Sequence, residues 1–141
     1  MSFPLAFILL LFVGLIAFVF LTAAIGRAYS NYKLKIKQKL RKGYSKEEFI
    51  KHFTDLNFNE QTINNLYNKI KSSLPSSFIP HPNDNLSDDY QLHKDYLSYV
   101  ALDLFRKTQG QSPNIEQEKY LSKKKSVDTF VKILNFAEKK I

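Results

Sequence analysis

PLAFILLLFVGLIAFVFLTAAIG, from Pro4 to Gly26, has no charged side chain. A helix over this stretch is roughly 34 Å long at about 1.5 Å per residue, which is enough to cross a hydrocarbon core roughly 30 Å thick. One such segment cannot close a barrel, so only a helix satisfies its backbone hydrogen bonds in lipid. We therefore predict a transmembrane anchor over residues 1–26.

A cleaved secretory signal peptide is the alternative for the same stretch. Thr22, Ala23 and Ala24 are small side chains of the kind found before a cleavage site. Against cleavage, no cation precedes Pro4, and the apolar run exceeds the usual length of about 7 to 15 residues. The positive charges that follow the run also resist export, so we expect an uncleaved anchor.

The next stretch, RAYSNYKLKIKQKLRKG from Arg27 to Gly43, contains seven of the chain's 21 basic residues and no acidic residue. Short flanking segments rich in Lys and Arg stay in the cytoplasm, whereas residues 1–3 carry no such charge. We therefore expect a single-pass protein of the plasma (inner) membrane, with its amino terminus outside and the rest of the chain in the cytoplasm.

The apolar residues of this basic stretch have helical spacing. One helix face would contain Ile25, Tyr29, Tyr32, Ile36 and Leu40. We therefore predict a basic juxtamembrane helix over residues 27–43 that continues the anchor and stops near Gly43. The residues expected at the membrane interface are Arg27, Tyr29, Tyr32, Lys33, Lys35, Lys37, Lys39, Arg41 and Lys42. A charged, solvated stalk that only sets topology is the alternative to lipid recognition.

The remaining residues, 44–141, are nearly neutral, with 14 basic and 13 acidic side chains. A nucleic-acid-binding domain needs a basic face on its folded part, so we expect no nucleic-acid partner. The chain has no cysteine, which excludes disulfides, thiolate metal sites and thiol nucleophiles. No segment has convincing strand periodicity. We predict an all-α fold in which a cytoplasmic domain of four to five helices follows the anchor.

The helix boundaries of the domain follow from capping residues and prolines. Ser45 with Glu48 forms a capping-box pattern, and Asn59 is placed to cap a second helix that ends before Pro75. A proline-rich loop over residues 75–87 is expected next. We expect a third helix from Asp88-Asp89 to about Lys107, closed by Gly110. A short helix from about Ile115 to Leu121 is expected after a Ser112-Pro113 cap. The final helix is expected after a Ser126 cap, and one of its faces would contain Val127, Phe130, Val131, Leu134 and Ala137.

The loop and the expected start of the third helix contain the best candidate for a metal site. The candidates are His81, Asp84, Asp88, Asp89 and His93, with Asp89 and His93 expected on one helix face. The spacing matches neither the HExxH pattern nor a calcium-binding loop. A proline-rich connector followed by an acid-capped helix explains the same residues, and we predict no metal or other cofactor.

Two further features of the domain have alternative interpretations. Asp103 interrupts an apolar helix, where it either pairs with Arg106 or Lys107 or is a buried carboxylate with a raised pKa. Phe78 and Ile79, between prolines in the loop, either fold back over the core or bind a partner.

No Gly-x-Ser-x-Gly turn or phosphate-binding glycine loop is present. We therefore predict a non-enzymatic adaptor or accessory of a membrane complex, with the lipid bilayer and another membrane or membrane-associated protein as partners. The alternatives are a metal-dependent enzyme or accessory using residues 81–93, and a sensor of anionic lipid surfaces.

Overall fold

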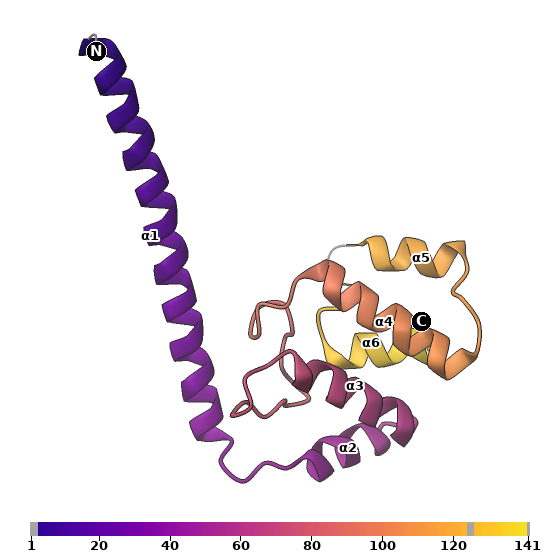
Figure 1. The fold of residues 1–141 in the computed structure, drawn as a ribbon. Helices are drawn as coiled ribbons and strands as arrows, with labels where there is room; N and C mark the ends of the chain where they lie inside the picture. The colour runs from indigo at the N-terminus through magenta and orange to yellow at the C-terminus, as the bar shows by residue number, and fades with distance from the viewer. Residues whose placement is uncertain (1–2, 124–125, 141) are drawn as a thin grey trace. The chain divides into compact units, whose positions relative to one another are not determined.

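The structure, a computed structural model, describes residues 3–123 and 126–140, and this part of the chain forms six helices (Figure 1). The helices are α1 (Phe3–Leu40), α2 (Lys46–Thr54), α3 (Glu60–Ser72), α4 (Lys94–Gln109), α5 (Ile115–Ser122) and α6 (Phe130–Ala137). The only β-type pairing among the described residues is one isolated antiparallel bridge, between Asn85 and Thr129. The prediction of an all-α fold with a long apolar first helix and a small helical bundle is confirmed.

The contacts within the chain divide it into two units, Met1–Ile36 and Lys37–Ile141. In the first unit, α1 continues without a break from the apolar stretch into the basic stretch, as its helical spacing predicted. Its large apolar side chains between Leu5 and Ile25 are exposed. By length and composition, α1 is the one helix in the described part of the chain that could cross a membrane. The same properties also fit a signal sequence near the amino terminus.

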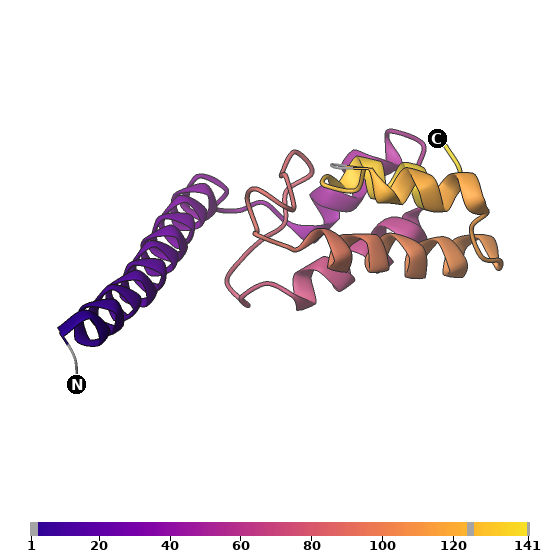
Figure 2. The ribbon, with the colours of Figure 1, turned by 90° about the horizontal axis from the view of Figure 1, so that it is seen from above.

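The second unit contains a bundle in which α4 packs most extensively against α6, and α3 contacts both (Figures 1 and 2). Helix α2 joins the bundle through α3. The core is strongly aromatic, because the ring of Phe49 contacts Phe53, Tyr67 and Phe130 in edge-to-face geometry at centroid distances of about 5 Å. All five helices after α1 contribute buried apolar side chains.

Local chemistry explains the helix ends that the sequence predicted correctly. The Ser45 side chain accepts a hydrogen bond from the Glu48 backbone, and the Glu48 side chain accepts one from the Ser45 backbone, so the capping box is present. Asn59 caps α3, which ends before Pro75. Gly110 closes α4 with a φ of 67°, a left-handed conformation that glycine adopts at little cost.

The predicted start of the third helix at Asp88-Asp89 is wrong, because α4 begins at Lys94 and is capped by His93. The Asn85 side chain accepts hydrogen bonds from the backbone N–H groups of Ser87 and Asp88, which holds this segment in a turn. Asp89 and His93 therefore do not share a helix face.

Two predicted caps are also wrong. Helix α5 is capped by Asn114, in a capping box with Gln117, rather than by Ser112-Pro113. Helix α6 begins at Phe130 rather than after Ser126. The residues before α6 pair with the loop instead, since the Leu86 backbone N–H donates to the Asp128 carbonyl at 2.7 Å. Val127 is buried outside the helix, and Val131 is exposed.

Candidate functional site

The alternating lysines of α1 lie in two rows because the segment is helical. Residues two apart are separated by about 200° around a helix, whereas residues four apart lie on the same side. Lys33, Lys37 and Arg41 therefore form one row, and Lys35 and Lys39 form another. The last helical turn of α1, from Lys37 onward, belongs to the unit that contains the bundle.

Arg41 lies at the centre of a partly buried polar network. Its Nη1 donates to Asp84 Oδ2 at 2.6 Å, and its Nη2 contacts the other carboxylate oxygen, so the pairing is bidentate. Asp84 also accepts hydrogen bonds from the Tyr90 hydroxyl and, at 3.2 Å, from the His81 backbone N–H. The side chain of Asp84 is 1% exposed, so this carboxylate depends on protein partners rather than on water.

The charges in this network are mutually stabilised. Burial disfavours the charged Arg41 guanidinium, but the hydrogen bond and the negative charge of Asp84 outweigh burial and raise the pKa of Arg41. Burial, together with the hydrogen bond to Asp84, raises the pKa of the Tyr90 hydroxyl far above its ordinary value. Both groups therefore keep their protons at neutral pH and act as hydrogen-bond donors to Asp84.

Two neighbouring side chains extend the network along α1. Lys37 Nζ lies 2.6 Å from Asp89 Oδ1. Gln38 hydrogen-bonds both backbone groups of Ile79, donating to the carbonyl at 3.2 Å and accepting from the N–H at 2.9 Å. We call this network the clasp; it consists of Lys37, Gln38, Arg41, Ile79, Asp84, Asp89 and Tyr90.

The clasp connects residues that the sequence had assigned to two different sites. Lys37 and Arg41 were predicted at the membrane interface, and Asp84 and Asp89 were metal candidates. Sequence reasoning missed the pairing of these cations with these acids, and it assigned no role to Gln38. The i, i+4 spacing of Lys37 and Arg41 was the available signal, because in a helix it predicts two cations on one side.

The five metal candidates do not converge. Among residues 3–123 and 126–140, no group of three or more His, Cys, Asp or Glu side chains is placed to hold a metal ion. His81 packs its ring 4.8 Å from that of Tyr44, and burial, aided by the charge of Arg41, lowers its pKa. Asp88 is exposed, and the exposed His93 lies 3.4 Å from Asp95 at the start of α4.

The loop residues Phe78 and Ile79 face the protein. Phe78 is buried and Ile79 is half-buried, and the backbone carbonyl of Phe78 accepts a hydrogen bond from the Lys71 side chain. Of the two alternatives for these residues, the structure has the one in which the loop folds back. The Phe78 ring is therefore not part of the exposed surface.

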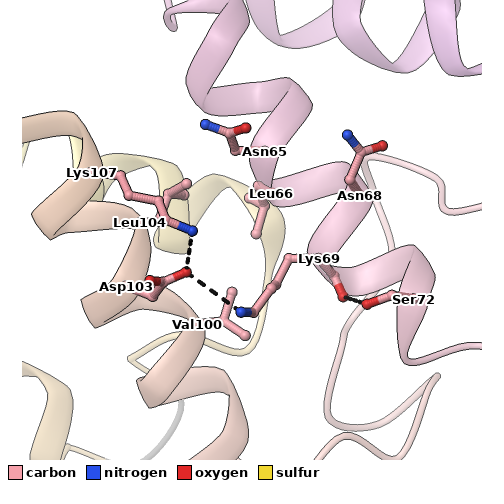
Figure 3. Close-up of a pocket in the computed structure, with 9 residues that line it drawn as sticks. All are labelled: Asn65, Leu66, Asn68, Lys69, Ser72, Val100, Asp103, Leu104 and Lys107. Atoms are coloured by element: carbon pink, nitrogen blue, oxygen red, sulfur yellow. Dashed lines mark hydrogen bonds and ion pairs between the residues drawn. The ribbon is translucent and has the colours of Figure 1, made fainter.

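The bundle has a shallow groove between α3 and α4, with a volume of about 270 Å³ (Figure 3). Buried Leu66 and Leu104 contribute its apolar part, and exposed Asn65 and Asn68 lie along its rim. A second hollow of about 620 Å³ shares Asn65 and Lys107 with the first and is lined mainly by amide and hydroxyl side chains. The amide-rich surface therefore continues along the same pair of helices.

Asp103 lies between two lysines in this groove (Figure 3). Its Oδ2 is 2.9 Å from Lys107 Nζ on the same helix and 3.5 Å from Lys69 Nζ on α3. The hydrogen bond from Lys107 lowers the pKa of Asp103, and the charge of Lys69 contributes to the same shift. The predicted pairing with Lys107 is confirmed, and the carboxylate is ionised rather than poised as an acid. The groove offers hydrogen bonds and charge to a polar ligand.

Comparisons with protein-family models, with curated proteins and with solved structures found no match for this chain.

Proposed function

We propose that this protein is a single-pass membrane protein that presents a small helical adaptor domain on the cytoplasmic face of the plasma (inner) membrane. The main supporting observation is α1, an exposed helix of 38 residues whose first part has no charge and whose last part is strongly basic. Burying so long an apolar surface in lipid removes it from water, which stabilises the inserted state.

The charge distribution supports the proposed orientation. All seven cations of residues 27–43 follow the apolar segment, and no charged side chain precedes it. Positively charged flanks remain in the cytoplasm, so the amino terminus is outside and the bundle is inside.

A membrane anchor stays in the mature protein, whereas a signal sequence is cleaved off, so the two alternatives predict different products. We expect the full-length protein to remain with membranes after extraction with alkaline carbonate, and its intact mass to include the whole apolar segment from Pro4 to Gly26. A soluble product that begins near Ile25 would contradict the proposal.

The adaptor role rests on the groove between α3 and α4. Its exposed amides and paired lysines suit a polar surface of another membrane or membrane-associated protein, and anchoring raises the effective concentration of the domain near such partners. The lining contains both apolar and polar side chains, which gives the groove both contact area and directional hydrogen bonds.

Capture from native membranes tests the groove. Proteins cross-linked to the full-length chain would be compared with those captured by Asn65→Arg, which places a bulky charge on the rim. Gln111→Arg is the matched control, because Gln111 is exposed and lies outside the groove lining. We expect Asn65→Arg to lose cross-linked partners that Gln111→Arg retains. Equal capture by both variants would contradict a role for the groove.

A further inference from the structure

Some cations of α1 have an acidic partner within the folded protein and others do not. Lys37 and Arg41 have buried acidic partners in the clasp. In contrast, Arg27 and Lys35 are exposed, and neither side chain has an ion pair or hydrogen bond within the described part of the chain. Arg27 and Lys35 are therefore solvated in the folded protein and available to an anionic partner outside it.

Two tyrosines lie between these cations along the helix. Tyr29 is 70% exposed and Tyr32 is 64% exposed, and both lie on one side of α1 with Ile36. A tyrosine ring has an apolar body and a polar hydroxyl, a combination favoured at the boundary between hydrocarbon and water. Because Arg27 and Tyr29 are two residues apart and lie on opposite sides of the helix, the cations and the tyrosine rings surround α1 at this level instead of sharing one face.

The distance from the end of the apolar segment limits which cations reach the membrane surface. At about 1.5 Å per residue, Arg27 lies within roughly 2 Å of Gly26 along the helix axis and Lys35 within roughly 14 Å. Long side chains on a helix point toward its amino terminus, which brings the Lys35 ammonium several ångström closer to the bilayer. Lys39, still within α1 and roughly 20 Å from Gly26 along the axis, lies well beyond the Debye length of about 8 Å at physiological salt.

We propose that Arg27, Tyr29, Tyr32 and Lys35 form a surface that binds the anionic headgroups of the cytoplasmic leaflet. This inference rests on the proposed membrane insertion and orientation. Charge complementarity selects lipid over a second copy of this chain, because two copies would bring the exposed cations Arg27 and Lys35 together, and no acid lies between Arg27 and Gly43. The clasp cations do not belong to this surface, since Asp84 and Asp89 already neutralise them.

Native mass spectrometry of the full-length protein in lipid nanodiscs tests this surface. The discs contain equal amounts of phosphatidylglycerol and phosphatidylcholine, and the lipids that stay bound to the ejected protein are counted. The double variant Arg27→Gln and Lys35→Gln removes two charges from the proposed surface. The matched control, Lys39→Gln with Lys42→Gln, removes two exposed charges farther from the bilayer.

We expect the wild-type chain and the control to retain more phosphatidylglycerol than phosphatidylcholine. In the first variant, the ratio of the two bound lipids should fall about fivefold for each cation removed, the equivalent of about 1 kcal/mol. Equal retention of the two lipids by the wild type, or equal losses in both double variants, would overturn the proposal. Two protein copies per disc without bound anionic lipid would identify a second copy as the occupant instead. Failure of the chain to enter the discs at all would contradict the proposed function rather than this surface.

Discussion

Lys35 and Lys37 are two residues apart in the same helix, yet their surroundings differ completely. Lys37 Nζ contacts the buried carboxylate of Asp89 at 2.6 Å, whereas Lys35 is exposed without such a partner in the described part of the chain. The difference follows from the helical angle of about 200° between them. A count of positive charges therefore does not assign a role to this segment, because Lys37 and Arg41 contact acids of the domain, whereas Lys35 has no such partner among the described residues.

The largest effect should come from removing Arg41. The substitution Arg41→Gln removes the bidentate partner of the buried Asp84 carboxylate and leaves Lys37 Nζ, 3.9 Å away, as its remaining cation, so we expect the free energy of unfolding of the domain to fall by about 3 kcal/mol. Chemical unfolding of the full-length protein in detergent micelles, followed by circular dichroism, measures this loss.

The control for Arg41 is Lys42→Gln, which removes the same charge from an exposed position and should change the free energy of unfolding by less than about 0.5 kcal/mol. The double variant Arg41→Gln with Asp84→Asn should lose less unfolding free energy than the sum of the losses in the two single variants, because it also removes the buried negative charge. Additive effects would show that the two side chains do not interact in the folded protein.

Substitutions of Lys37 and Lys35 directly compare how much the two rows of cations contribute to stability. Lys37→Gln removes a partly exposed ion pair to Asp89, and we expect a loss of about 1 kcal/mol in the free energy of unfolding. Lys35→Gln should leave stability within about 0.5 kcal/mol of the wild type. The same denaturation experiment distinguishes them, and equal losses would remove the distinction between the two rows.

The smallest effect concerns Asp103 and its dependence on pH. Because Lys107 lowers the pKa of Asp103 in the folded state, its ion pairs stabilise the protein above the unfolded-state pKa of about 3.9, and this contribution is lost as the pH falls through the lower folded-state pKa. We expect Asp103→Asn to cost about 0.5 kcal/mol at pH 7 and nothing at strongly acidic pH. A difference in stability that stayed constant from pH 7 to pH 2 would contradict this assignment.

Local patterns predicted most of the fold, whereas the clasp depends on contacts between distant residues. The capping box at Ser45, the cap at Asn59 and the terminator at Gly110 each depend on neighbours within one helical turn. Such signals are present in the sequence itself.

The start of α4 and the clasp could not be predicted in the same way. A turn built on Asn85 replaced the helix expected at Asp88, because side-chain hydrogen bonds competed with helix formation. Arg41 and Asp84 are separated by 43 positions, and no local pattern specifies that they meet. From the sequence, Asp84 and Asp89 were metal candidates, and Asp89 also suited a helix start; only the folded chain shows that Arg41 pairs with Asp84 and Lys37 with Asp89.

The proposed topology can be measured directly because the chain contains no cysteine. A single cysteine introduced by Ser2→Cys or by Gln111→Cys is therefore a unique target for a membrane-impermeant maleimide. In intact cells we expect labelling of Ser2→Cys alone, with Gln111→Cys labelled only after the membrane is permeabilised. Labelling of Gln111→Cys in intact cells, with Ser2→Cys protected, would contradict the proposed orientation.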